Sequence, residues 1–209
     1  MFKLIIGNKN SSSWSLRPWL ALKMIAEPFE EHTIPLGQAE TRASILAINP
    51  AGKLPLLIDH TLKVWDSLAI CEYLADCFPH ARLWPEEARA RAVARSMAAE
   101  MHAGFTALRQ QLPMDVAHRR DVAHDESAAA DIARIVSLWQ EHLNRNQAQG
   151  PFLFGHFTIA DAFYAPVVTR FVTYGTTLPP LAQRYADHML SLPAMQEWYA
   201  AAEIEVGNE

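Results

Sequence analysis

The chain has 209 residues, of which 50% are hydrophobic and 20% are charged, so it can form one large or two small domains with cores of their own. The net charge of −5 and the scattered basic residues exclude nucleic acid as the expected partner. No stretch approaches the roughly 18 uninterrupted apolar residues of a membrane span, and the first eight residues turn polar too early for a signal peptide. We therefore expect a cytoplasmic protein without membrane contact.

The first 78 residues alternate between short apolar runs and longer amphipathic stretches. A strand, a helix and a strand within the first 36 residues predict a βαβ unit with parallel strands, and a tight turn near residue 60 predicts an antiparallel hairpin. Residues 37–49 are expected to be loop with at most one turn of helix. The predicted strands are 2–6, 29–36, 54–60 and 62–65, and the predicted helices are 14–26 and 68–77.

The second half of the chain is expected to be helical throughout. Residues 79–87 contain two prolines and show no periodicity, which is typical of a linker. The fold class is therefore α/β plus all-α, with a thioredoxin-like βαβ-ββα domain in 1–78, a linker in 79–87 and an all-helical domain in 88–209. The predicted helices of that domain are 88–111, 127–146, 158–171, 181–190 and 193–202.

The two cysteines, Cys71 and Cys77, are six residues apart on a predicted helix. At about 100° per residue their side chains point in different directions, so we expect no disulfide between them. The chain has no CxxC pair and no zinc-type spacing, so we also expect no metal. Both are expected to be buried or partly buried thiols, which suits a reducing cytoplasm.

Three consecutive serines, Ser11, Ser12 and Ser13, stand where the first strand gives way to a helix. The first N–H groups of a helix have no partner inside it and carry partial positive charge. An anion such as a thiolate is stabilised there. The alternative is that one serine simply caps the helix, and three serines leave room for both roles.

Four motifs in order resemble the cytosolic glutathione S-transferases, in particular bacterial serine-type members of zeta or beta character, and a fifth segment is similar to the family's last helix. The resemblance covers nearly the whole chain. The motifs are S-S-S-W-S-L-R-P-W-L-A-L-K (Ser11–Lys23), N-P-A-G-K-L-P-L-L (Asn49–Leu57), D-S-L-A-I-C-E-Y-L (Asp66–Leu74) and F-T-I-A-D-A-F (Phe157–Phe163), followed by P-A-M-Q-E-W-Y-A-A-A (Pro193–Ala202).

The resemblance implies glutathione as co-substrate, with no metal, and a serine hydroxyl that stabilises its thiolate. The activating position falls on Ser12, with Ser11 or Ser13 as alternatives if the loop carries an insertion. The family's proline shortly after this serine is missing. The family's cis-proline corresponds to Pro55, which would leave the backbone of Leu54 free to pair with an extended tripeptide.

The γ-glutamyl end of glutathione is expected at the start of the helix that follows residue 65. Ser67 and the free N–H groups would bind its carboxylate, and Asp66 its ammonium group, with Lys53 near the glycyl carboxylate. The alternative without a binding role is that Asp66 or Ser67 caps the helix N-terminus and that Lys53 is a solvated loop residue. Asp66 departs from the family's usual glutamate by one methylene.

The helical domain is expected to complete a pocket for a small hydrophobic electrophile and to take part in a homodimer, as the family implies. The candidate pocket residues are Trp14, Met101, His102, Phe105 and Met114. Thr158 and Asp161 have the spacing of a capping box, so we assign Asp161 to folding and not to catalysis.

Three other functions are weighed against the transferase. A zeta-like isomerase of the maleylacetoacetate type shares a serine-rich loop with tryptophan, but the chain offers only Arg17 where those enzymes have two arginines. A non-catalytic protein of the same fold is the alternative outside enzymes, because fold does not fix function. A serine hydrolase is disfavoured because the chain has no G-x-S-x-G motif.

Overall fold

A four-stranded sheet organises the first part of the computed structural model, which describes residues 1–207. Strands β1 (Phe2–Ile6) and β2 (Phe29–Thr33) pair in parallel, joined by helix α1 (Ser13–Ile25). Strands β3 (Leu56–Asp59) and β4 (Leu62–Trp65) form the antiparallel hairpin, and β3 pairs antiparallel with β1. The sheet order β2-β1-β3-β4 and the mixed pairing are those of a thioredoxin-like domain, as predicted.

Alternating side chains of the central strands enter two separate cores. Leu4 and Ile6 of β1 point to the face covered by α1 and by helix α3 (Ser67–Cys77), within the main core. Ile5 points to the opposite face, where it packs with Ile45 of helix α2 (Thr41–Ile48). The period of two along the strand therefore gives both faces of the sheet a helical cover.

Helix α2 corrects the prediction that residues 37–49 are mostly loop. It has eight residues, and Ile45 is its one buried residue. A helix that buries so little carries almost no apolar periodicity, so the sequence pattern is weak there. The sheet face that α2 covers stabilises this helix more than its own helix propensity does.

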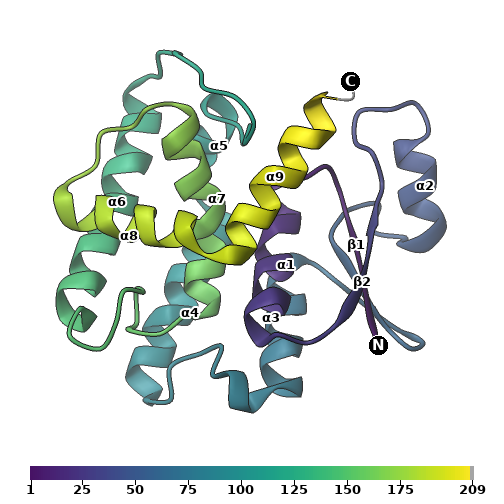
Figure 1. Cartoon of the computed structure of the whole chain (residues 1–209), viewed down its shortest axis with the longest axis horizontal. Helices are drawn as coiled ribbons and strands as arrows, with labels where there is room; N and C mark the ends of the chain where they lie inside the picture. The colour runs from purple at the N-terminus through teal and green to yellow at the C-terminus, as the bar shows by residue number, and fades with distance from the viewer. Residues whose placement is uncertain (208–209) are drawn as a thin grey trace.

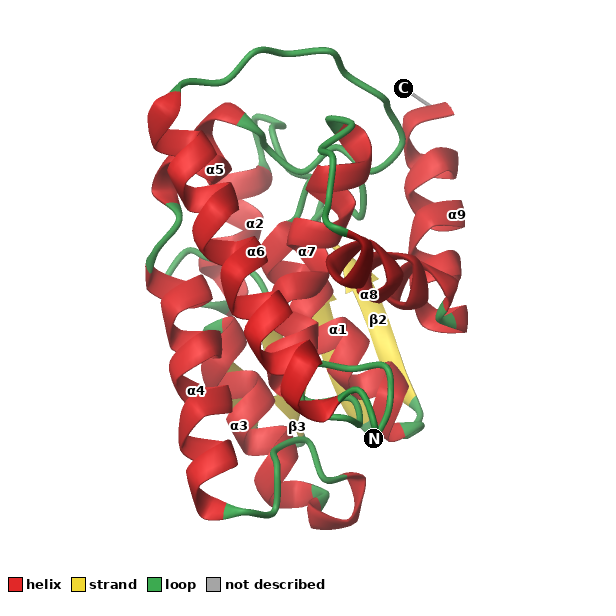
Figure 2. Ribbon diagram, turned by 90° about the vertical axis from the view of Figure 1, so that its left-hand side faces the viewer, coloured by secondary structure: helices red, strands yellow, loops and turns green. Residues whose placement is uncertain are grey.

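The remaining described residues are helical and pack around one buried helix, α7 (Ile159–Thr173), nearly all of whose side chains are enclosed. Helix α7 packs against both α1 and α4, so it joins the helical part to the thioredoxin-like part. The other helices are η1 (Pro79–Ala81), α4 (Ala88–Ala103), α5 (Thr106–Gln111), α6 (Glu126–Asn146), α8 (Pro180–Ser191) and α9 (Pro193–Gly207). Figure 1 shows this arrangement, and in the turned view of Figure 2 the sheet lies behind the helices. The linker boundaries at residues 79–87 stay a prediction.

The single helix predicted for 88–111 is wrong, because the chain breaks between α4 and α5. Gly104 ends α4 in an extended conformation, and Phe105 follows with a left-handed φ of 55°. A Cβ on Gly104 would lie 2.8 Å from the carbonyl oxygen of Glu100, so glycine is required for this ending. The guanidinium of Arg109 then donates to the carbonyls of Met101, His102 and Gly104. This fixes the break, since those carbonyls have no partner within α4.

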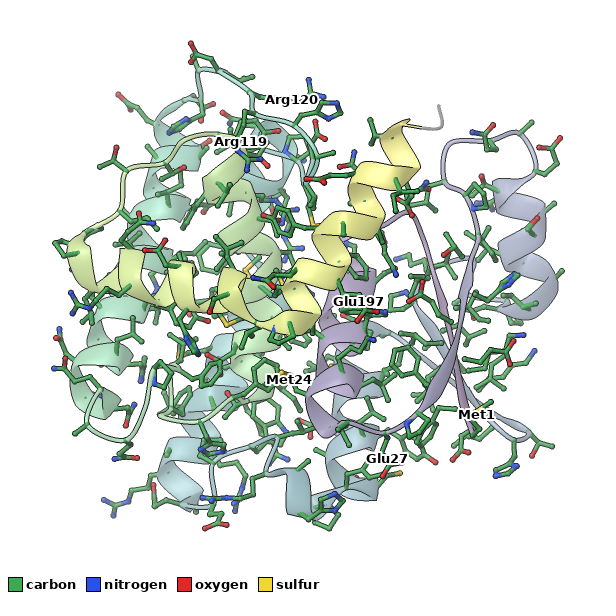
Figure 3. All side chains as sticks on the ribbon, viewed as in Figure 1. Met1, Met24, Glu27, Arg119, Arg120 and Glu197 are labelled. Atoms are coloured by element: carbon green, nitrogen blue, oxygen red, sulfur yellow. The ribbon has the colours of Figure 1, made fainter. Side chains whose placement is uncertain are left out.

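Helix α9 extends to Gly207, beyond the end predicted at residue 202, and runs beside α1 (Figure 1). The rings of Trp19 and Trp198 meet edge to face with centroids 5.0 Å apart, and Lys23 pairs with Glu197 at 2.7 Å. Figure 3 shows Glu197 on α9 where this helix passes α1. The last turns of α9 therefore reach the loop between β1 and α1. Among the helices of residues 1–207, none has both the length and the apolarity to cross a bilayer.

Candidate active site

Ser12 occupies the N-cap position of α1, but its hydroxyl does not cap the helix. Its Oγ lies 2.7 Å from the Oγ of Ser15, which itself accepts a hydrogen bond from the N–H of Gly7 at 3.1 Å. Ser15 is fully buried, and Ser12 is its one side-chain acceptor within the described chain. When Ser15 is the donor in this pair, its fully buried hydroxyl has an acceptor. The proton of Ser12 is then free to be donated outward.

The start of α1 also offers an unused backbone donor. The N–H of Trp14 has no hydrogen-bond partner within residues 1–207, whereas the N–H of Ser15 bonds to the carbonyl of Ser12 at 3.1 Å. Trp14 is partly exposed. An anion beside Ser12 would therefore meet a hydroxyl donor, a free N–H and the positive end of the helix dipole.

The other two serines have different surroundings. Ser11 is exposed and lines a cavity of about 610 Å³, whereas Ser13 is buried inside the first turn of α1. The three serines thus point to three environments, namely the cavity, the helix start and the interior. Of the three serines, Ser12 has its hydroxyl in a chain of hydrogen bonds that starts at the N–H of Gly7, directly after β1, and passes through Ser15.

The segment before β3 presents a free edge of backbone. The Leu54–Pro55 peptide bond is cis, and the backbone of Leu54 makes no hydrogen bond within the described residues. Asn49, almost fully buried, shapes this segment: its amide donates to the carbonyl of Lys53 at 2.8 Å and accepts from the N–H of Ala51. The Lys53 side chain is exposed. An extended peptide could pair with Leu54 as an added strand.

Asp66 and Ser67 stand together at the start of α3. The Asp66 carboxylate caps the helix by accepting from the N–H of Leu68 at 2.8 Å, and its second oxygen lies 3.3 Å from Nε2 of His102. Burial lowers the pKa of His102 while Asp66 opposes this shift, so the ring is mostly neutral near pH 7. Asp66 therefore combines capping with a negative charge that stays partly exposed.

Ser67 is buried, and its Oγ accepts a hydrogen bond of 3.5 Å from the guanidinium of Arg17. Arg17 is fully enclosed between the rings of Trp14 and Phe163, at 4.2 and 4.5 Å from the ring centroids. Burial lowers the pKa of Arg17, and Arg109 and Arg170 lower it further. Within residues 1–207 Arg17 forms no ion pair, and its Nε has no partner. Its positive charge is thus directed toward the start of α3 without a matching carboxylate.

The five residues predicted for the electrophile pocket lie in different surroundings. Trp14 and His102 pack edge to face at 5.2 Å, beside Asp66, whereas Met101 and Phe105 are buried. Met114 alone among the five lines the cavity next to Ser11. That cavity mixes apolar and polar side chains, and its other lining residues are Asn10, Gln110, Gln111, Pro113, Asp115, His118, Arg120, Val122, Tyr174 and Val206. Figure 3 places Arg120 on the connection between α5 and α6.

Neither cysteine resembles a reactive site. Cys71 is fully buried in α3, and burial raises the pKa of its thiol well above the usual range, so it stays protonated. Cys77 is exposed at the end of α3, and both are free thiols. In the part of the chain that the structure describes, no group of three His, Cys, Asp or Glu side chains is arranged to hold a metal ion.

Sequence reasoning missed Ser15 and Asn49 and considered Arg17 only as a counterpart of the zeta-type arginines. All three lie inside the quoted motifs, so their positions carried a signal. Ser15 and Arg17 are polar residues on a helix that is otherwise almost entirely buried. Buried polar side chains are normally hydrogen-bonded to specific partners. A polar residue at a buried position of α1 is therefore the sequence signal that could have identified Ser15 and Arg17.

The fold and the site together define a two-domain protein with a thioredoxin-like first domain, whose free donors gather at the starts of α1 and α3. Residues 11–77 match the family model described as glutathione S-transferase, N-terminal domain. Residues 86–201 match the one described as glutathione S-transferase, C-terminal domain. The chain therefore belongs to the glutathione S-transferase family.

Two of the similar proteins carry the names of two kinds of enzyme. A Caenorhabditis elegans protein named "Probable maleylacetoacetate isomerase" is 26% identical over 189 residues, which is 89% of this chain and 87% of that protein. Glutathione S-transferase GstB of Escherichia coli K12 is 24% identical over 202 residues, with 93% and 96% covered. The chain is thus similar both to a protein named as a transferase and to one named as an isomerase.

Solved structures of similar fold cover nearly the whole chain. A glutathione transferase homolog from Burkholderia, solved with bound glutathione, superposes with a TM-score of 0.73 at 22% identity and covers 97% of this chain and 98% of that one. Maleyl pyruvate isomerase, described as a bacterial zeta-class enzyme, gives a TM-score of 0.74 at 24% identity, with 95% and 97% covered. At such identities these structures show the shared fold.

Proposed function

We propose that the protein is a glutathione transferase in which the hydroxyl of Ser12 activates the thiol of glutathione. The observation that supports this most strongly is the Ser12 hydroxyl, which lies at the N-terminus of α1 without capping it and is 2.7 Å from the Oγ of Ser15. A free thiol has a pKa of about 8.5, so little thiolate exists at neutral pH. A hydroxyl donor and a helix N-terminus both favour the charged form.

The proposed binding mode uses the remaining site residues in the order of the tripeptide. The cysteinyl backbone of glutathione pairs with the free N–H and C=O of Leu54, before Pro55. The γ-glutamyl carboxylate meets Ser67, and its ammonium group meets Asp66. Because Arg17 donates to the Ser67 oxygen, the hydroxyl proton of Ser67 is left to donate to the carboxylate. The exposed Lys53 side chain is placed for the glycyl carboxylate.

The proposed reaction follows from the thiolate. Its sulfur attacks an electrophilic carbon and forms a C–S bond, while a leaving group departs with its electron pair. When the acceptor is an activated double bond, the adduct instead takes a proton from water. The cavity that begins at Ser11 lies next to Ser12 in the chain and suits an electrophile with an apolar body and a polar group, because Met114 and Val122 share its wall with Gln111 and Arg120.

A second candidate is a glutathione-dependent cis–trans isomerase, which the name of the nematode relative favours. The thiolate would add to a cis double bond, the resulting single bond would rotate, and elimination would return glutathione unchanged. Arg120 is the arginine that lines the cavity, whereas Arg17 is enclosed by two rings. A single cavity arginine offers less for a substrate with two carboxylates than the pair in zeta-type enzymes, so we place the isomerase second.

Two measurements separate these functions from each other and from a non-catalytic role. The first is retention of the full chain on immobilised glutathione, which both enzyme functions require. The second is the amount of glutathione consumed per product: one molecule in conjugation of a model electrophile, and none in isomerisation of maleylacetoacetate. Retention without either turnover would support the non-catalytic protein, and failure of retention would contradict both enzyme functions.

We also propose a cytoplasmic homodimer. The large apolar side chains of Leu62 and Trp65 on the edge strand β4 are 46% and 53% exposed, and Val93 on α4 is 39% exposed. Exposed apolar side chains on an edge strand are unfavourable unless something covers them. Light scattering on the purified protein should give twice the chain mass of 23.4 kDa, and a monomer mass would contradict this.

A further inference from the structure

The end of helix α9 contacts the backbone just before the three serines. The two carboxylate oxygens of Glu205 accept hydrogen bonds from the consecutive N–H groups of Lys9 and Asn10, at 2.9 and 3.0 Å. One carboxylate therefore holds two neighbouring peptide units of the loop between β1 and α1, although the residues are 195 and 196 positions apart in the sequence. Figure 1 shows α9 ending beside this loop.

The position of Glu205 in its own helix is unfavourable. It lies in the last turn of α9, which contains no basic residue, where a negative charge meets the negative end of the helix dipole. The two charge-assisted hydrogen bonds from the loop offset this cost. The carboxylate thus has its favourable partners in the loop and not in the helix, which points to a role in holding the loop.

The same loop has further ties to the helical domain. The indole N–H of Trp198 donates to the carbonyl of Lys9 at 2.8 Å. The side chain of Asn10 donates to Asp115 at 3.0 Å and accepts from the N–H of Ala117 at 2.9 Å. The helical domain therefore holds the backbone of Lys9 and Asn10, in addition to the turn in which the N–H groups of Ser11 and Ser12 bond to the carbonyl of Asn8.

We propose that Glu205 is a positioning residue for Ser12. By holding the N–H groups of Lys9 and Asn10, it sets where α1 begins and hence where the Ser12 hydroxyl and the free N–H of Trp14 point. This inference rests on the proposed function of Ser12. Within the described residues, no hydrogen bond joins Glu205 or this loop to Leu54, Asp66 or Ser67, so without Glu205 we expect glutathione to bind almost as before while its thiol is less well stabilised.

The test compares Glu205→Ala with Glu203→Ala, a matched control on the same helix whose side chain is exposed and lies away from the loop. We expect Glu205→Ala to raise the pKa of the bound thiol by about one unit and to lower kcat at neutral pH about tenfold. The KM for glutathione should change less than twofold. Glu205→Gln keeps one acceptor oxygen, so its effects should be intermediate, and it serves as the second variant if the alanine variant folds poorly.

Equal thiol pKa and kcat in the Glu205→Ala and Glu203→Ala proteins would overturn the proposal, as would a KM that rises as much as kcat falls. Thermal unfolding of each variant shows whether the measurements report folded protein. The outcome is separable from the proposed function of Ser12. If Ser12→Ala itself leaves the thiol pKa unchanged, the proposed function fails, whereas a shift in Ser12→Ala without one in Glu205→Ala refutes only the role of Glu205.

Discussion

Replacing Asp161 by alanine would remove one acceptor from four buried donors at the start of α7. The carboxylate accepts hydrogen bonds from the N–H of Leu153 at 3.1 Å and from the N–H and hydroxyl of Thr158 at 2.8 and 2.9 Å. The hydroxyl of Tyr185 donates to it at 3.2 Å. Thr158 and Asp161 form the capping box of α7, whose Phe163 lies against Arg17. The perturbation therefore loosens the helix that joins the two domains.

The expected loss in the free energy of unfolding of Asp161→Ala is the difference between two opposing contributions. In the alanine variant four buried donors lose their acceptor, which costs about 1.5 kcal/mol each, or about 6 kcal/mol together. Burial raises the pKa of Asp161 from 3.8 to about 6, so keeping it ionised at pH 7 costs the folded state about 3 kcal/mol. Asp161→Ala should therefore destabilise the protein by about 3 kcal/mol at pH 7, which lowers Tm by about 6–12 °C for a chain of this size.

The stability that Asp161 contributes should decrease as pH rises. Because the folded-state pKa is raised, the stability that Asp161 contributes is greatest below pH 4, and about 3 kcal/mol of it is lost as pH rises through 6. Urea unfolding of wild type and Asp161→Asn at pH 4 and pH 7 measures it, since asparagine does not titrate. The stability advantage of wild type should shrink by about 3 kcal/mol from pH 4 to pH 7. A difference that is the same at both pH values, or a loss below about 1 kcal/mol in Asp161→Ala, would refute the reasoning.

Two further predictions concern the polar residues of α1. Ser15→Ala removes the donor that orients Ser12, so titration of the bound thiol should give a raised pKa although Ser12 is intact; an unchanged pKa would exclude the orienting role. Arg17→Met replaces a buried cation that has no ion pair, so the urea midpoint should stay equal or rise while the KM for glutathione increases severalfold, because Ser67 loses its donor. A lower midpoint with an unchanged KM would mean that Arg17 serves packing alone.

Much of the fold could be predicted from local pattern. The strands of the sheet, the hairpin and helices such as α6 have apolar periodicity that matches their burial. Apolar periodicity gave wrong predictions where tertiary contacts determine whether a helix forms or ends. Helix α2 exists because a sheet face needs cover, and the break at Gly104 depends on Arg109 reaching back to the carbonyls of α4. A run of strong helix formers on both sides of Gly104 conceals that break in the sequence.

The candidate site was predictable only in part, for a similar reason. The segments at Ser12, Leu54 and Asp66 could be singled out because serines, a proline and a capping pair follow local rules. The partners of those residues follow no local rule. Ser15 occupies an ordinary helical position, and Glu205 lies almost the whole chain away from the loop that it holds. A single sequence does not reveal that these groups meet.

The bound thiol's pKa tests the account most directly. Thiolate absorbance in the ultraviolet, followed against pH in saturating glutathione, should be compared for wild type, Ser12→Ala and Ser11→Ala. We expect wild type to hold the thiol pKa below its ordinary value of about 8.5, Ser12→Ala to return it toward that value, and Ser11→Ala to leave the wild-type value unchanged. An unchanged pKa in Ser12→Ala, or a shift in Ser11→Ala alone, would contradict the assignment of Ser12.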